Sequence, residues 1–301
     1  MDELILEVHQ SLDEIQFSKI QSLLNSCAET DGLNPFSEHA ILHMQYGHET
    51  EVQHILCTSG EDLVGYAHVD LSDAIYGPSM EVAVDPDFRR HGVGKKLIEL
   101  VVNNYPSRPI RLWAHGLNTG ASSLAASCGF KQVRTLLQMR RSLMAPIPPA
   151  VFTSNVEVRP FNADSDLPAL LVCNQKAFSN HPEQGQWTIS NFQQRTSETW
   201  FDPKGLRVAV SGDEIVGYGW TKVDDVNADS KLGEIYIVGV CPEWQKQGLG
   251  KAFTIDGLRY LRSLNLNTAL LYVDADNLSA ISLYESLGFS HWDTDTLFQL
   301  G

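Results

Sequence analysis

The sequence lacks the patterns of several protein classes. Its five cysteines are scattered and form no Cys-x-x-Cys pair, which argues against both a disulfide framework and a structural zinc site. No apolar run approaches the length of a membrane-spanning helix, and the first residues, Met-Asp-Glu-Leu-Ile-Leu-Glu, are acidic where a signal peptide is basic. We therefore expect a soluble cytoplasmic protein with no membrane partner.

Basic residues are also scarce. Lysine and arginine together number 22 against 37 aspartates and glutamates, which gives a formal net charge of −15 at pH 7. An acidic surface repels the phosphates of nucleic acids and attracts amines and other cations. We expect a monomer with no nucleic-acid partner, acting on a small molecule that carries an amine.

The two common nucleotide-binding loops are missing. A Walker loop has four residues between its glycines and a Ser or Thr after its lysine, whereas Gly248 and Gly250 are separated by one residue and Ala252 follows Lys251. A dinucleotide fingerprint needs a third glycine where this chain has Phe253. Both classes of nucleotide fold are therefore disfavoured.

The chain does have a β-rich run, residues 232–240, that leads into a glycine-containing loop and then an apolar helical pattern. Pro242 stops the run, and Gly248 and Gly250 lie at the mouth of the helix. Unpaired backbone N–H groups and the helix dipole point at such a loop. We therefore predict an anion site whose ligand is a phosphate.

An internal repeat organises the chain. Residues 84–95, Val-Asp-Pro-Asp-Phe-Arg-Arg-His-Gly-Val-Gly-Lys, align without a gap with residues 240–251, Val-Cys-Pro-Glu-Trp-Gln-Lys-Gln-Gly-Leu-Gly-Lys, at an offset of 242 − 86 = 156. A Pro-Ile-Pro-Pro stretch between the copies suits an extended linker. We predict tandem domains at 1–145 and 156–301, joined by a proline-rich linker at 146–155.

Each copy has the same order of patterns. In the second copy a hairpin at 205–222 precedes the loop strand, which is followed by a helix to about 264, a strand at 269–273 and a short helix that ends at Gly288. Strands that alternate with helices in this way indicate an α/β fold with a mixed sheet.

The loop pattern Gln-x-x-Gly-x-Gly-Lys at 245–251 resembles the pyrophosphate loop of the GCN5-related N-acetyltransferases (GNAT). The resemblance implies acetyl-CoA as cosubstrate, no metal, and a sheet whose parallel fourth and fifth strands splay apart to admit the pantetheine arm. The predicted cofactor contacts lie on strand ends, loops and helix starts of both copies: Val238, Gly239, Val240, Gln245, Lys246, Gln247, Gly248, Leu249, Gly250, Lys251, Asn277, Leu278, Ser279, Ala280, Ile281, Ser282, Val82, Ala83, Val84, Arg90, His91, Gly92, Val93, Gly94 and Lys95.

Two residues are predicted to move protons. Glu234 shares a strand face with Tyr236 and Val238, so its carboxylate projects toward the expected cleft as the base; the alternative is a solvent-facing glutamate. Tyr284 precedes the Leu-Gly-Phe helix ending, where the GNAT resemblance implies the acid that protonates the coenzyme A thiolate; the alternative is a packing tyrosine. Gly239 is expected to mark a β-bulge, or else close packing.

The first copy differs at these positions. When the two short helices are aligned on their final glycines, Gly129 and Gly288 (288 − 129 = 159), Ala125 lies opposite Tyr284. When the strands before the loops are aligned with the offset of 156, Pro78 lies opposite Glu234 and Ala83 opposite Gly239. We therefore expect the first domain to bind acetyl-CoA without catalysing a reaction.

A tandem GNAT chain with this degraded first half resembles the mycothiol synthase family, notably at Ser-Glu-His 37–39, Asn-His-Pro-Glu-Gln-Gly 180–185 and the 277–289 helix. That resemblance implies acetylation of the cysteinyl amine of a cysteinyl-glucosaminyl-inositol acceptor, a site between the domains, and acceptor contacts at Glu38, Glu183, Lys222, Glu234 and Tyr272. His39 and His43 lie one helical turn apart but show no third ligand, so no metal is predicted.

Two other functions stay open. The same fold acts on other amines, such as an aminoglycoside, a polyamine or a protein N-terminus, and a chain that binds acyl-CoA without turnover would be a sensor. Glu234 and Tyr284 favour an enzyme, and an acceptor screen separates the remaining choices.

Overall fold

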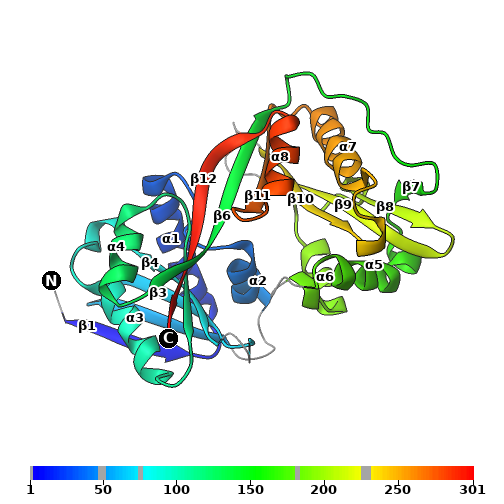
Figure 1. Ribbon diagram of the computed structural model, residues 1–301. Coiled ribbons are helices and arrows are strands. Elements are labelled where there is room, and N and C mark those ends of the chain that lie inside the picture. Colours follow the sequence, from blue (N-terminus) through cyan, green and yellow to red (C-terminus); the bar gives the residue numbers. More distant parts are fainter. Residues whose placement is uncertain (1–2, 47–51, 74–76, 180–183, 225–231) are drawn as a thin grey trace. The chain divides into compact units, whose positions relative to one another are not determined.

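The computed structural model describes residues 3–46, 52–73, 77–179, 184–224 and 232–301 of the chain. They form two compact units (Figure 1). Unit 1 contains residues up to Leu137 together with 274–276 and 293–301, and unit 2 contains 138–273 and 277–292. Among the described residues, no helix has both the length and the apolar character required to cross a membrane.

Unit 1 is a mixed sheet with helices on both faces. Its strands occur in the order β1-β2-β3-β4-β5-β12, with β4 and β5 parallel and the other assigned pairs antiparallel. The elements that lie wholly in its first segment are β1 (Leu4–His9), α1 (Glu14–Asp31), α2 (Glu38–Tyr46), β2 (Val52–Ser59), β3 (Asp62–Asp70), β4 (Ser79–Val84), α3 (Val93–Asn104), β5 (Ile110–Ala114) and α4 (Thr119–Ser127).

The alternation of side chains along β3 and β4 builds a separate core on each face of the unit 1 sheet. Tyr66 and Ala83 pack with α1 and with Phe36, whereas Val69 and Met80 pack with α3 on the opposite face. Successive residues of a strand point to opposite faces, so both faces of these central strands are apolar and buried.

Unit 2 repeats this order. Its strands occur in the order β6-β11-β10-β9-β8-β7, and β10 runs parallel to β11 but antiparallel to β9. The elements are β7 (Glu157–Pro160), α5 (Ala163–Ala177), α6 (Ile189–Thr196), β8 (Leu206–Ser211), β9 (Glu214–Asp224), β10 (Leu232–Val240), α7 (Leu249–Ser263), β11 (Thr268–Asp274) and α8 (Leu278–Ser286). The predicted α/β fold with a mixed sheet is confirmed.

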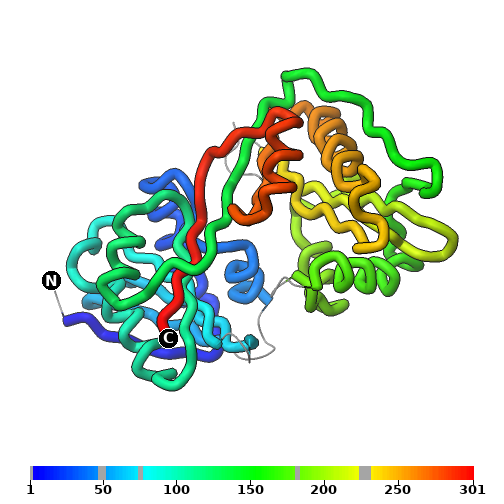
Figure 2. The backbone as a smooth tube through the Cα atoms, viewed as in Figure 1, coloured from blue at the N-terminus to red at the C-terminus, as the bar shows by residue number. Residues whose placement is uncertain are grey.

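The last strand of each copy does not stay with its own copy. β6 (Lys131–Ser142) contributes residues 138–142 to unit 2, and residues 293–300 of β12 (Ser290–Leu300), together with Gly301, belong to unit 1. There Leu300 pairs with Ile110 and Thr296 with Ala114, antiparallel to β5; this segment is the red end of the tube in Figure 2. The repeat predicted two copies but carried no signal for this exchange, and the predicted domain ranges stay a prediction.

Candidate active site

The central strand β10 parts from its parallel neighbour β11 near its beginning. The two strands pair only at Gly233 with Ala269 and at Glu234 with Leu270, although both continue for several residues. The predicted splay therefore starts directly after Glu234. In unit 1, β4 and β5 part in the same way after Glu81 and Trp113.

The bulge in β10 is at Tyr236, not at Gly239 as predicted. Ile235 pairs with Thr221 and Ile237 with Trp220, so Tyr236 is the extra residue. Gly239 pairs in register with Tyr218, and a Cβ on Gly239 would lie 2.5 Å from the Tyr218 ring. Close packing is therefore the reason for this glycine.

The bulge also changes which side chains share a face. Ile235 points toward α7, because its Cδ1 lies 2.7 Å from the place of a Cβ on Gly257, so its neighbour Glu234 points to the α5/α6 face. Tyr236 faces that side too, since its hydroxyl accepts a 2.9 Å hydrogen bond from Nε of Arg195 in α6. Val238 instead packs in the cluster of Phe253 in α7. The prediction that Val238 shares the face of Glu234 was wrong, because the extra residue reverses the alternation.

Glu234 lies in a polar and aromatic setting. It is 8 % exposed, and its cross-strand neighbour in β9 is Lys222. The Lys222 Nζ lies 5.2 Å from the ring centroid of Trp200 and 5.9 Å from that of Tyr236. Directly opposed residues of an antiparallel pair have side chains on the same face. Glu234, Lys222 and Tyr236 are therefore neighbours on the α5/α6 face.

Of the other predicted acceptor contacts, Tyr272 follows Leu270 by two residues on β11 and so emerges on the same face as Glu234. It is 41 % exposed, and its hydroxyl accepts a 2.7 Å hydrogen bond from Nε2 of Gln138. Glu183 lies outside the described residues. Glu38 begins α2 of unit 1. Three of the five predicted contacts, Glu234, Lys222 and Tyr272, thus lie on one sheet face at the splay.

A buried arginine beside this face was not among the predicted site residues. Arg195 is 6 % exposed, donates to the Tyr236 hydroxyl and to the carbonyl oxygen of Asn191, and stacks with its guanidinium carbon 4.2 Å from the ring centroid of Trp187. The tryptophans that flank α6 were the available signal, because aromatic rings commonly line small-molecule sites.

The loop between β10 and α7 has the backbone of an anion site. Lys246 and Gly248 both adopt left-handed conformations, with φ of 62° and 86°, and Gly248 is the N-cap of α7 without a side-chain cap. The first N–H groups of a helix have no intrahelical partner. Left-handed lysine is strained, by about 1–2 kcal/mol, and strain of this kind is concentrated at ligand sites.

Unit 1 repeats this loop geometry at Arg90 and Gly92, where φ is 66° and 85°, before the uncapped start of α3. The two units differ in what surrounds the next glycine. A Cβ on Gly94 would lie 2.8 Å from Cδ2 of Leu124 in α4, whereas the corresponding position on Gly250 has no other described atom within 4 Å. The helix start is therefore backed by an apolar side chain in unit 1 and open in unit 2.

Three groups can be distinguished among the side chains of the predicted cofactor residues. Those of Ala83, Val93 and Leu249 are buried in the cores, so only their backbone is available to a ligand. The amides of Gln245 and Gln247 fold back and donate to the carbonyl oxygens of Val240, at 3.1 Å, and Glu243, at 3.2 Å. The remaining long polar side chains of the two loops are exposed: Arg90, His91, Lys95, Lys246 and Lys251.

The helix α8 carries the predicted acid. Asn277 caps it by accepting a hydrogen bond from the backbone N–H of Ala280 at 3.2 Å, and residues 277–282 are exposed or half-buried. Tyr284 is half-buried with its ring 5.9 Å from that of Phe289. Burial raises the pKa of Tyr284, so the phenol keeps its proton at neutral pH, as an acid must.

Unit 1 has a different charge arrangement. The register of β3 and β4 places Ser79, not Pro78, in the position of Glu234, because the Tyr236 bulge shifts the alignment by one residue. Glu81 is buried nearby, but it accepts hydrogen bonds from the backbone N–H and the hydroxyl of Ser37 at 2.7 and 2.6 Å. Glu81 therefore anchors the start of α2.

A buried histidine completes this anchor. The His115 Nε2 lies 3.4 Å from Glu81, and its Nδ1 lies 3.0 Å from Asp295 of β12. Burial lowers the pKa of His115, but the two carboxylates outweigh burial and raise it to about 10. Burial raises the pKa of Glu81, and His115 and Ser37 together hold it at about 2. The pair is charged at neutral pH.

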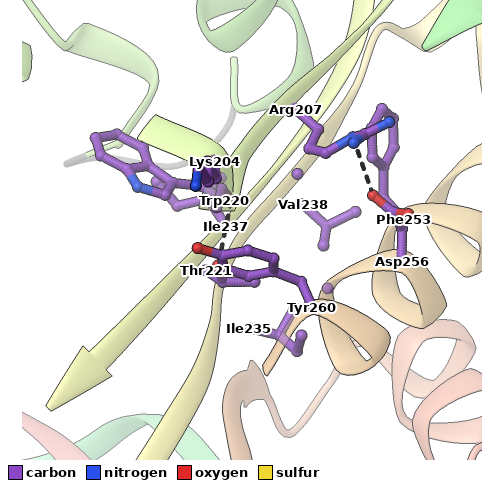
Figure 3. Close-up of a pocket in the computed structure, with 13 residues that line it drawn as sticks. Lys204, Arg207, Trp220, Thr221, Ile235, Ile237, Val238, Phe253, Asp256 and Tyr260 are labelled. Atoms are coloured by element: carbon purple, nitrogen blue, oxygen red, sulfur yellow. Dashed lines mark hydrogen bonds and ion pairs between the residues drawn. The ribbon is translucent and has the colours of Figure 1, made fainter. Parts of the chain in front are cut away.

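A small pocket in unit 2 lies away from this chemistry. Figure 3 shows it among β9, β10 and α7, beside the ion pair of Arg207 Nε and Asp256 Oδ2 at 3.2 Å. Of the predicted site residues its lining includes Val238 alone. Four of its lining residues belong to α7: Phe253, Asp256, Gly257 and Tyr260.

Comparison with known proteins gives a consistent result. An acetyltransferase (GNAT) family model matches residues 173–289, and an acetyltransferase (GNAT) domain model matches residues 51–132. The chain is 43 % identical over 310 residues to a mycothiol acetyltransferase of Acidothermus cellulolyticus, covering 98 % of this chain and 94 % of that one. It is 42 % identical over 296 residues to a mycothiol acetyltransferase of Streptomyces scabiei, with the same coverage.

Solved structures share the tandem fold at low identity. A tandem GNAT protein from the clavulanic acid biosynthesis pathway superposes with a TM-score of 0.75 at 16 % identity, covering 99 % of this chain and 98 % of that one. A GCN5-related N-acetyltransferase from Sphaerobacter thermophilus superposes with a TM-score of 0.70 at 23 % identity, covering 99 % and 95 %.

Proposed function

Because this chain belongs to the mycothiol acetyltransferase family of tandem GNAT enzymes, we propose that unit 2 transfers the acetyl group of acetyl-CoA to the cysteinyl amine of a cysteinyl-glucosaminyl-inositol acceptor. The product of that transfer is mycothiol. The observation that carries the proposal is the buried carboxylate of Glu234 where β10 and β11 part, on the strand that leads into the left-handed loop of Lys246 and Gly248.

The loop supplies the cofactor site in this proposal. Its backbone N–H groups and the start of α7 hold the pyrophosphate of acetyl-CoA. Gly250 leaves the adjacent space open, and Lys246 and Lys251 add positive charge at the surface. The pantetheine arm then runs along β10 toward the splay, where the thioester meets the acceptor amine.

The two proton-transfer residues complete the reaction. Glu234 removes a proton from the attacking amine, directly or through a water, so that the nitrogen lone pair adds to the thioester carbonyl. The tetrahedral intermediate collapses by breaking the carbon–sulfur bond, and Tyr284 gives its proton to the departing thiolate. Burial raises the pKa of Tyr284, which keeps the donor protonated until the thiolate forms.

The α5/α6 face supplies the acceptor contacts. Lys222 and the hydroxyl of Tyr272 offer donors to the sugar hydroxyls, while Trp200 and Tyr236 provide flat apolar surfaces for sugar rings. The contacts implied for Glu38 and Glu183 stay predictions. Unit 1 is proposed to bind acetyl-CoA through the Arg90 to Gly92 loop without catalysis, because Ser79 and Ala125 replace the base and the acid.

A competition assay tests this function. Purified protein is given acetyl-CoA with an equimolar mixture of the cysteinyl-glucosaminyl-inositol compound, a polyamine, an aminoglycoside and a peptide, and acetylated products are separated by mass. We expect acetylation of the cysteinyl compound to dominate, with one coenzyme A released per product. Preferential acetylation of another amine would replace the acceptor, and binding of acetyl-CoA without turnover would favour a sensor.

A further inference from the structure

Three potential metal ligands, two from α2 and one from the end of β3, lie close together in unit 1. His39 and His43 lie one turn apart on α2, with their ring centroids 4.0 Å apart. The His39 Nε2 lies 3.0 Å from Oδ2 of Asp70 at the end of β3. One ligand atom from each of the three residues lies within 4.8 Å of the other two. This is the spacing of a preformed site for a single cation.

A third histidine, His68, lies behind these three residues. His68 is 2 % exposed, and neither of its ring nitrogens makes a hydrogen bond to any residue that the structure describes. Its ring centroid is 5.7 Å from that of His43. Buried polar atoms without partners are costly and rare. An unpartnered imidazole beside a His-His-Asp cluster therefore points to a ligand that would use its lone pair.

The repeat shows that this cluster occupies a distinctive place. Asp70 pairs with Ser79 in unit 1, as Lys222 pairs with Glu234 in unit 2. Asp70 follows Gly65 of β3 by five residues (70 − 65), and Lys222 follows Gly217 of β9 by the same number (222 − 217). By the same count, His68 takes the place of Trp220. The helix α2 corresponds in chain order to α6, which carries Arg195. Asp70 and His68 of unit 1 thus stand where unit 2 has Lys222 and the buried Trp220.

We propose that unit 1 holds one divalent transition-metal ion of the zinc class, bound by His39, His43 and Asp70, with the adjacent imidazole of His68 turning toward the ion as the fourth donor. Three imidazole nitrogens and one carboxylate oxygen suit Zn²⁺ in tetrahedral coordination and disfavour Mg²⁺ and Ca²⁺, which prefer oxygen ligands. Binding replaces the hydrogen bond between His39 and Asp70 and releases protons from the ligands.

The bound ion ties α2 to the sheet. Without the metal, the start of α2 is held by the hydrogen bonds from Ser37 to Glu81. The metal would attach the following turns of α2 to β3 by joining His39 and His43 to Asp70. No metal was predicted from the sequence, because Asp70 is 31 residues from His39 and only the fold brings the two side chains together. The site does not depend on acetyl transfer by unit 2.

Metal titration of the full chain tests the proposal. The protein is stripped with a chelator, and Zn²⁺ is titrated against a competing indicator dye. We expect one ion per chain with a Kd below about 1 μM, a range that several well-placed ligands reach. Cobalt(II) in the same site should show the strong visible absorption of tetrahedral coordination.

Two near-isosteric variants and one control locate the ion. Asp70→Asn and His68→Phe should each weaken Zn²⁺ binding by about tenfold or more and remove the cobalt(II) bands. His291→Gln, at an exposed histidine of unit 2, should leave both unchanged. Circular dichroism of each metal-free variant confirms that it is folded before titration.

A second readout covers the case of a variant that folds poorly. In the wild-type chain, one equivalent of Zn²⁺ should raise the melting temperature and slow hydrogen exchange in α2, whereas Mg²⁺ should do neither. The proposal is overturned if the wild-type protein binds less than a stoichiometric amount of Zn²⁺. It is equally overturned if the ion protects another segment, or if Asp70→Asn binds Zn²⁺ as tightly as wild type does.

Discussion

Replacing Glu234 by glutamine isolates the proposed base. The amide matches the carboxylate in size, so the packing on the α5/α6 face beside Lys222 is retained at this 8 % exposed position. A general base contributes about two to four decades in rate, which corresponds to about 2.7–5.4 kcal/mol of transition-state stabilisation. We therefore expect kcat/KM of Glu234→Gln to fall by about 10²- to 10⁴-fold.

Acetyl-CoA binding should survive the same change. Glu234 precedes the end of β10 at Val240 by six residues (240 − 234), about 20 Å of strand, so the loop of Lys246 and Gly248 lies well beyond direct contact. The Kd for acetyl-CoA, measured by calorimetry, should stay within about twofold, since a remote substitution on an intact scaffold has little effect.

The assay must follow acetyl transfer itself, because the acceptor carries a thiol that reacts with the usual coenzyme A reagents. Chromatographic separation of the acetylated product and of coenzyme A avoids this interference. Glu214→Gln, at an exposed residue of β9, is the matched control and should retain wild-type kinetics. Wild-type turnover in Glu234→Gln, or a parallel loss of acetyl-CoA binding, would refute the assignment of Glu234 as the base.

Three further outcomes follow from other parts of the structure. Tyr284→Phe should lower kcat by about 10²-fold with acetyl-CoA affinity unchanged, as measured by steady-state kinetics and calorimetry. Gly248→Ala forces a side chain into a left-handed conformation, at a cost of about 1–2 kcal/mol, and should weaken acetyl-CoA binding and turnover, whereas Gly92→Ala should leave turnover unchanged in the same assay. The pKa of His115 is raised from 6.5 to about 10, so the stability that charged His115 adds to the fold is complete below pH 6.5 and is lost as the pH rises through 10. The difference between the urea midpoints of wild type and His115→Gln should therefore be larger at pH 6 than at pH 10.

The parts of the site that sequence reasoning found have strong local causes. Gly248 and Gly92 hold φ near 85° before an uncapped helix, and few other residues tolerate that conformation, so the loop leaves a visible pattern in both copies. Strands β4 and β10 are mostly apolar because helices cover both of their faces, which makes their existence easy to predict.

The parts that were missed depend on contacts between distant residues. The pair of His115 and Asp295 joins residues 180 positions apart (295 − 115), and it exists only because the end of β12 lies beside β5. The Arg195 guanidinium contacts Asn191 and Trp187 nearby in the sequence, but the Tyr236 hydroxyl that links it to β10 is 41 residues away. Hydrophobic periodicity reports which face of an element is buried, and it carries no information about such pairings.

The bulge at Tyr236 explains why two copies with the same loop differ in chemistry. The last residues of the two strands, Val84 in β4 and Val240 in β10, face α3 and α7, the helices that follow the loops. Toward the beginning of each strand, successive side chains then alternate between the two faces. An unbroken β10 would turn Glu234 toward α7, because a shift of one residue exchanges the two faces of a strand. The extra residue restores Glu234 to the face of Lys222, whereas β4, with a continuous register, places Ser79 beside Asp70. One inserted residue in an apolar strand thus decides where the carboxylate lies, and a gapless alignment of the copies cannot detect it.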